Sequence, residues 1–161
     1  MQRDDARFAE LERIESDPAA FLESLDDPVG RGVVRMADGS TAQRLPGFVR
    51  WMWDGDIAGS IGLRWQPGTA ELPPTCLGHI GYSVVPWKRR RGYGTAALAL
   101  ILPEARRIGL PYVEVVTDAD NVASQRVITA NGGLLVETFG KLAAHGGATG
   151  LRYRIAIAEA S

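Results

Sequence analysis

The sequence predicts a single α+β domain in which helices cover both faces of a mixed, mostly antiparallel sheet, giving three layers. Its 161 residues, 45% of them hydrophobic, are enough for one core. Strand-like segments come first as consecutive hairpins and then alternate with helices, which predicts one parallel strand pair. We expect one domain over residues 1–161, with N-terminal helices within 1–30 and the main core over 47–158.

The first 25 residues have the pattern of two helices. Phe8, Leu11 and Ile14 recur at helical spacing between charged residues. Asp17 before Pro18 predicts that a second helix starts there, because Asp caps and Pro is tolerated in the first turn. The glycine-, aspartate- and proline-rich stretch 26–47 predicts a loop with one short strand.

The middle of the chain predicts three antiparallel strands. Segments 47–53 and 57–65 flank Asp54-Gly55, a signal for a tight hairpin turn. A third strand is expected over 76–85 and should end at Pro86, which has no N–H to donate.

The C-terminal half alternates helices and strands. A helix over 95–109 should be kinked or split by Pro103 and capped by Gly109. After a strand over 111–117, Asn121 should cap a short helix that stops at Asn-Gly-Gly, 131–133. Strands over 134–139 and 151–158 complete the pattern.

Composition excludes several classes of protein. The net charge of −1 argues against a nucleic-acid partner, which would need a broad basic field. One cysteine allows no intrachain disulfide, and no apolar run is long enough to span a membrane. The charged N-terminus does not have the pattern of a signal peptide, so we expect a cytoplasmic protein. Two histidines and one cysteine, far apart, predict no metal site.

The run Lys88-Arg89-Arg90-Arg91 directly precedes two glycines and a helix. Cations at a helix N-terminus are unfavourable alone, because that end already carries a partial positive charge. The arrangement is favourable if an anion sits there, on backbone N–H groups that Gly92 and Gly94 leave uncovered. The alternative is a solvated charge run ahead of an ordinary helix.

Two blocks of this sequence resemble the GNAT superfamily of N-acyltransferases. Arg89-x-x-Gly92-x-Gly94 is similar to its acyl-CoA signature, Gln/Arg-x-x-Gly-x-Gly/Ala, between a strand and a helix. Asn121-x-x-Ser124, running into the Asn-Gly-Gly stop, resembles its next helix. The resemblance covers about residues 47–158 and extends to a bacterial branch of acetyltransferases.

The resemblance implies that the parallel strands, 76–85 and 111–117, splay apart around the pantetheine arm of acetyl-CoA. The basic side chains would meet the 3′-phosphate. The implied CoA-binding residues are Ser83, Val84 and Val85 for pantetheine; Arg89, Arg90, Arg91, Gly92, Tyr93, Gly94 and Thr95 for the pyrophosphate; and Asn121 and Ser124 near the thioester.

The implied function is that of an enzyme, an N-acetyltransferase. It would transfer an acetyl group directly from acetyl-CoA to an amine of a small molecule or a protein, without a metal. The alternative is a catalytically weak acyl-CoA-binding regulatory module. A longer acyl group and a homodimer also remain open.

The catalytic residues depart from the family pattern. The tyrosine that often acts as the acid would stand seven residues after Asn121, where this chain has Ile128. The candidates to move protons are His79, Tyr153 and Glu114. Each has an alternative: a structural histidine, a half-buried strand tyrosine, and a paired or edge-facing carboxylate. Tyr82 is a weaker candidate.

Overall fold

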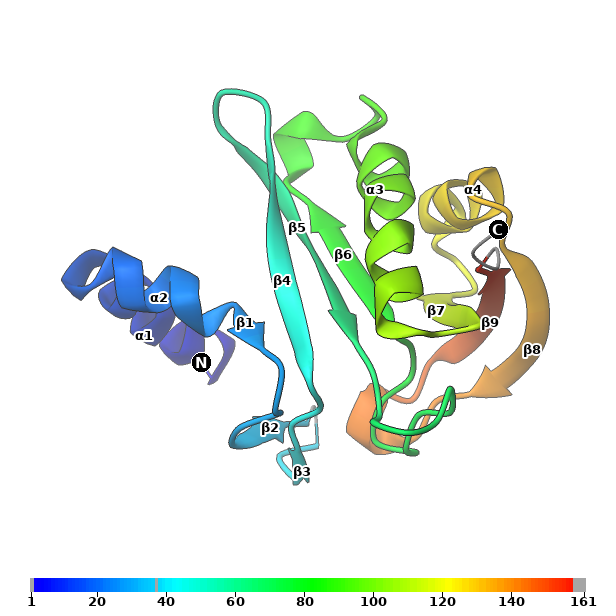
Figure 1. Ribbon diagram of the computed structural model, residues 1–161, viewed down its shortest axis with the longest axis horizontal. Coiled ribbons are helices and arrows are strands. Elements are labelled where there is room, and N and C mark those ends of the chain that lie inside the picture. The colour runs from blue at the N-terminus through cyan, green and yellow to red at the C-terminus, as the bar shows by residue number, and fades with distance from the viewer. Residues whose placement is uncertain (1, 37, 158–161) are drawn as a thin grey trace.

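The computed structural model describes residues 2–36 and 38–157 (Figure 1). Residue 158, where the last strand was expected to end, lies outside the described residues. The helices are α1 (Gln2–Ser16), α2 (Pro18–Ser24), α3 (Tyr93–Ile108) and α4 (Val122–Ala130), with 3₁₀ turns η1 (Pro86–Lys88) and η2 (Ala143–His145). The strands are β1 (Asp26–Asp27), β2 (Val33–Arg35), β3 (Thr41–Gln43), β4 (Gly47–Trp53), β5 (Ile57–Arg64), β6 (Ile80–Val84), β7 (Tyr112–Asp118), β8 (Leu134–Gly140) and β9 (Thr149–Ala156).

Within the described residues, seven strands form one sheet in the order β1-β4-β5-β6-β7-β9-β8. Only β6 and β7 pair in parallel, so the prediction of a mixed, mostly antiparallel sheet is confirmed. The last strand lies between β7 and β8, which leaves β8 at the edge. Stretch 26–47 holds three short strands rather than one: β1 joins the sheet, and β2 pairs with β3.

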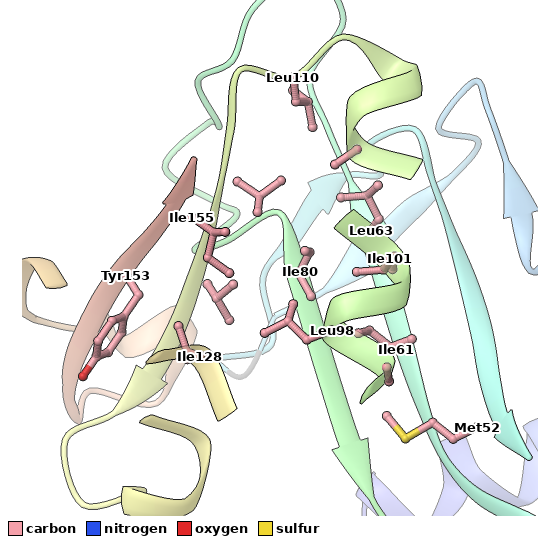
Figure 2. Close-up of a cluster of buried hydrophobic side chains, with 14 of the residues drawn as sticks. Met52, Ile61, Leu63, Ile80, Leu98, Ile101, Leu110, Ile128, Tyr153 and Ile155 are labelled. Atoms are coloured by element: carbon pink, nitrogen blue, oxygen red, sulfur yellow. The ribbon is translucent and has the colours of Figure 1, made fainter. Parts of the chain in front are cut away.

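The main core lies between the sheet and helices α3 and α4 (Figure 2). Leu63 and Val113 from the sheet and Leu98 and Ile128 from these helices are almost fully buried. On the opposite face, the Phe21 ring of α2 lies 5.9 Å from the ring of Trp51 in β4. The expected arrangement, with helices on both faces of the sheet, is therefore confirmed.

The predicted start of the second helix is confirmed. The Asp17 side chain accepts a hydrogen bond from the N–H of Ala20 at 3.0 Å, and Pro18 occupies the first turn. The apolar stripe of α1 is not buried: Phe8 and Leu11 are 68% and 52% exposed.

Of the two outcomes predicted for Pro103, a kink or a split, the split does not occur, because α3 continues through it. The helix runs from Tyr93 to Ile108, starting two residues earlier than expected, and ends as expected at Gly109 in the left-handed conformation. Pro103 and Ala99, whose carbonyl loses its helical partner, both lie on the exposed side of the helix. Water can therefore satisfy that carbonyl, while the buried side keeps its packing.

The third strand of the sheet is shorter than predicted, starting at Ile80 rather than Cys76. The Gly78 carbonyl accepts from the Arg64 side chain at 2.8 Å and from the Cys76 thiol at 3.3 Å, instead of forming a ladder. His79 then bridges two strands: its N–H donates to the Glu114 carbonyl, and its carbonyl accepts from the N–H of Arg64, each at 2.8 Å.

Candidate active site

The parallel strands β6 and β7 meet at one point and then separate. Their only registered pair is Ile80 with Val115. Beyond it, a slot of about 220 Å³ opens between them. The slot is lined by residues of β6 and β7 and by Asn121, Ser124 and Lys141. It thus contains the two residues of the second sequence block.

Part of the backbone of β6 does not pair with β5. The Val85 N–H donates to the Ala58 carbonyl at 2.8 Å, and Ser83 is registered with Ser60. Because backbone groups alternate along a strand, those of Val84 point away from β5, towards the open edge. The Arg89 Nε already donates to the Val84 carbonyl at 3.2 Å. Of the three predicted pantetheine contacts, only Val84 turns its backbone groups away from β5, and none of the three is among the residues that line the slot.

The N-terminus of α3 has the features of an anion site. Gly92 precedes the helix in the left-handed conformation (φ 80°) and provides no side-chain cap. The first helical bond within this turn runs from the Ala96 N–H to the Gly92 carbonyl. The N–H groups of Tyr93, Gly94 and Thr95 therefore have no acceptor within the helix. A β-carbon on Gly92 would meet nothing within 4 Å, so the space beside Gly92 is open, whereas Gly94 is buried against Tyr82 and Val127.

The basic run divides into two parts with different roles. Arg89, Arg90 and Arg91 are exposed around the helix start. Lys88 is buried instead, and its Nζ pairs with Oδ1 of Asp54 at 2.5 Å. The expectation that Lys88 meets a phosphate is thus corrected: its charge is used to hold the β4–β5 hairpin.

Asp54 has a second partner next to the anion site. The Tyr93 hydroxyl donates to its other carboxylate oxygen. The hydrogen bonds from Lys88 and then Tyr93 lower the pKa of Asp54 to about 2. The same hydrogen bond raises the pKa of Tyr93. One ionised carboxylate therefore fixes both sides of the loop that leads into α3.

A hydroxyl pair spans the slot. The Tyr82 hydroxyl and Oγ of Ser124 lie 2.8 Å apart, joining β6 to α4. Burial raises the pKa of Tyr82, so the phenol keeps its proton at neutral pH. Oδ1 of Asn121 accepts from the Ser124 N–H at 3.1 Å, as predicted for the helix cap. The side-chain NH₂ group of Asn121 therefore stays available to the slot.

His79 has the geometry of a structural histidine. It is fully buried, its Nδ1 accepts from the Glu114 N–H at 2.9 Å, and its Nε2 lies 3.0 Å from the Ala70 carbonyl. Burial lowers its pKa, so the ring is held neutral. Both nitrogens are occupied by backbone, which favours the alternative that the sequence left open.

The other two catalytic candidates also lie away from the slot lining. Tyr153 is buried on the core face beside Ile128 (Figure 2). Glu114 lies on the opposite face, where Oε2 is 3.7 Å from Arg152 and 3.6 Å from Arg154. The structure thus does not bring His79, Tyr153 and Glu114 together as one proton-transfer group.

A larger hollow of about 760 Å³ lies on the sheet face that α2 covers. Its walls come from α1, α2, the β2–β3 hairpin and the sheet itself. It shares Ile80, Gly81, Val116 and Lys141 with the slot, so the two cavities are neighbours where β6 and β7 separate. The candidate site therefore comprises the slot and the adjoining hollow on the α2 side of the sheet.

Sequence reasoning missed three parts of this site. Asp118 forms an ion pair with Lys141 at the end of the slot. Arg64 reaches across the sheet towards Gly81, and Tyr82 was only a minor candidate. Tyr82 carried a usable signal, because it sits on the strand before the anion loop. The other two depend on contacts between distant segments.

Comparison with known proteins identifies the family. The family model for the acetyltransferase (GNAT) domain matches residues 3–133. The chain belongs to the GNAT family of acetyltransferase domains, and the anion loop, the splayed strands and the capped second helix lie within the matched range. No curated protein matches the sequence significantly.

Solved structures show the same fold at low sequence identity. The microcin C7 self-immunity acetyltransferase MccE, in complex with acetyl-CoA and AMP, has a TM-score of 0.53 and 17% identity over 69% of this chain and 61% of its own. RimL, the ribosomal L7/L12 α-N-protein acetyltransferase in complex with CoA, has a TM-score of 0.55 and 17% identity over 69% of this chain and 62% of its own. RimJ from Mycobacterium smegmatis, in complex with CoA-disulfide, has a TM-score of 0.57 and 21% identity over 68% of this chain and 53% of its own. The chain thus spans about half to three fifths of these relatives.

No helix in the described part of the chain is long and apolar enough to cross a membrane. Residues 2–36 and 38–157 also contain no group of three or more His, Cys, Asp or Glu residues placed to hold a metal ion.

Proposed function

We propose that this protein is an acetyl-CoA-dependent N-acetyltransferase that transfers an acetyl group directly to an amine. The observation that carries the proposal is the combination of an uncapped helix start at α3, a slot between the splayed strands β6 and β7, and an adjoining hollow on the α2 face. Family membership and the fold shared with CoA-bound acetyltransferases support it.

The residues present fit acetyl-CoA as the acetyl donor. The N–H groups of Tyr93, Gly94 and Thr95 would bind the pyrophosphate, and exposed guanidinium groups beside them would pair with the phosphates. The Val84 backbone and the Asn121 side chain would orient the pantetheine arm. Arg89 would release the Val84 carbonyl when pantetheine takes its place.

The reaction needs little beyond orientation and proton transfer. The amine nitrogen attacks the thioester carbon, the C–N bond forms, the C–S bond breaks, and the amine loses a proton to water. The Val84 N–H is the group we propose to polarise the thioester carbonyl. We assign protonation of the leaving thiolate to the Tyr82 hydroxyl, because this half-buried phenol lines the slot.

The acceptor would occupy the hollow on the α2 face. A volume of about 760 Å³ falls within the range usual for small-molecule sites. A cytoplasmic setting is part of the proposal and is supported by the free thiol of Cys76. Turnover with an amine would separate this enzyme from the alternative, a CoA-binding regulatory module.

Thermal unfolding with acetyl-CoA, CoA, dephospho-CoA or buffer alone tests the CoA site. Ligand at 100 times its Kd should stabilise the fold by about 2.7 kcal/mol, which corresponds to a rise of a few degrees in Tm. A smaller rise with dephospho-CoA would support a role for the arginines in binding the 3′-phosphate. No rise at millimolar acetyl-CoA would overturn the proposal.

A further inference from the structure

A guanidinium group without a carboxylate partner stands where the hollow meets the slot. Arg64 is exposed on the α2 face of β5, and its Nε is held by the Gly78 carbonyl at 2.8 Å. A β-carbon placed on Gly81 would lie 3.8 Å from Nη2 and 3.9 Å from Nη1 of Arg64. The exposed guanidinium therefore lies close to Gly81, which lines both the hollow and the slot.

Several of the other charged groups that line the hollow have partners of their own, whereas Glu10 and Arg44 line it without an ion pair to any described residue. Lys141 pairs with Asp118, and the Arg13 guanidinium bonds Ser24. Asp27 accepts the N–H groups of Gly30 and Arg31 at 2.9 and 2.8 Å. Among the described residues, no carboxylate lies within ion-pair distance of Arg64. Arg64 therefore brings to the junction a positive charge that no ion pair with a described carboxylate neutralises.

A cation at this position affects any amine that approaches the thioester. It disfavours the ammonium form and so favours the neutral nucleophile. It also repels a cationic acceptor unless the acceptor brings a negative charge. An anionic oxygen pair matches the two Nη groups, because guanidinium binds carboxylate and phosphate through two parallel hydrogen bonds.

We propose that the acceptor is a small amine that also carries a carboxylate or phosphate, and that Arg64 binds this anionic group. The proposal rests on the acetyltransferase function proposed above and names the class of its acceptor. Arg64 is then a specificity residue: it orients the acceptor so that the amine lies near Gly81, at the mouth of the slot. Trp51 supplies an apolar wall for the remainder of the acceptor.

The test compares paired amines that differ in the anionic group. One series is a set of L-amino acids and their amides, and the other is phosphoethanolamine and ethanolamine. For at least one series, wild type should show a kcat/KM for the anionic member roughly 10- to 100-fold above the neutral one. The series that shows the preference identifies carboxylate or phosphate as the group bound.

Variants at Arg64 then locate the preference. Arg64→Gln should bring the ratio close to one, mainly through KM, and Arg64→Lys should retain part of it. Arg107→Gln, an equal change of charge at the far end of α3, should keep the full ratio. A wild-type ratio near one in both series, or a ratio that survives in Arg64→Gln, overturns the inference.

A binding measurement separates this inference from the proposed function. Acetyl-CoA should raise the Tm of wild type and Arg64→Gln equally. Anionic amines should add a further rise in the presence of unreactive CoA only where Arg64 is intact. An acetyl-CoA shift without any effect of anionic amines overturns the acceptor class alone. The absence of the acetyl-CoA shift overturns the proposed function itself.

Discussion

Tyr82 provides a hydroxyl in the slot, although Ile128 occupies the position where GNAT proteins often have the tyrosine that acts as the acid. Ile128 is fully buried in the core, whereas the Tyr82 hydroxyl meets Ser124 at 2.8 Å among residues that line the slot. A tyrosine on β6 could protonate the CoA thiolate as well as a tyrosine on α4, provided that its hydroxyl reaches the same part of the slot. The tyrosine missing from α4 is therefore no argument against catalysis.

Tyr82→Phe should lower kcat by about 10²-fold or more while KM for acetyl-CoA changes little, because only the proton donor is lost. Because burial raises the pKa of Tyr82 above its ordinary value of 10.0, the phenol should stay protonated at neutral pH. Loss of its proton should therefore cause no fall in the wild-type rate near pH 7. Steady-state kinetics across the pH range check both statements.

Tyr153→Phe is the matched control, because it removes a phenol from the core face rather than from the slot lining. It should keep a rate close to that of wild type. A normal rate in Tyr82→Phe, or a loss confined to Tyr153→Phe, would contradict the assignment of Tyr82.

Gly92 is required for its conformation and for its lack of charge. Its φ of 80° is strained for most side chains, although Asn and Asp tolerate it better. Gly92→Asp should abolish binding of CoA, because a carboxylate would stand beside the phosphates. Gly92→Asn has nearly the same shape without the charge, and it should bind CoA measurably. Calorimetric titration of both variants with CoA tests this, and equal affinities would refute the anion site.

At the scale of elements, the β4–β5 hairpin anchors the loop before α3 through Asp54. Because the folded-state pKa of about 2 lies below the ordinary 3.8, ionised Asp54 stabilises the folded state above about pH 4. That stabilisation is lost as the pH falls from about 4 to about 2.

Asp54→Asn should therefore lower the Tm at neutral pH, and the difference from wild type should disappear towards pH 2. Lys88 would lose its only carboxylate partner among the described residues. Asp56→Asn, in the same hairpin loop, is the control and should have little effect. Melting curves at a series of pH values measure the difference, and a gap that persists at pH 2 would exclude this role for Asp54.

Helix α3 shows how exposure decides the effect of a helix breaker. The sequence places Pro103 inside a helical pattern, but it cannot tell whether the carbonyl one turn earlier faces water. Here Ala99 and Pro103 share the exposed side, and Ala97, Leu98 and Ile101 remain packed in the core. The helix continues because its lost hydrogen bond can be replaced by water.

At the scale of the whole molecule, local features were predictable and long-range contacts were not. The Asn121 cap and the glycine before α3 are visible in the sequence, because each involves neighbours within a few residues. The Asp54–Lys88 and Tyr82–Ser124 contacts join residues 34 and 42 positions apart. Such pairs depend on strand register and on how far β6 and β7 diverge.

The slot and the adjoining hollow would give the two substrates separate routes to the site. A donor held on the α3–α4 side does not block the exit of a product from the α2 side, so acetylated amine can leave while spent CoA is still bound. Under the proposed direct transfer, both substrates must nevertheless be present together, since no acetyl group would be held covalently by the protein. Initial rates should therefore give intersecting double-reciprocal lines. A conjugate of donor and acceptor would inhibit only if one of its ends could enter between β6 and β7.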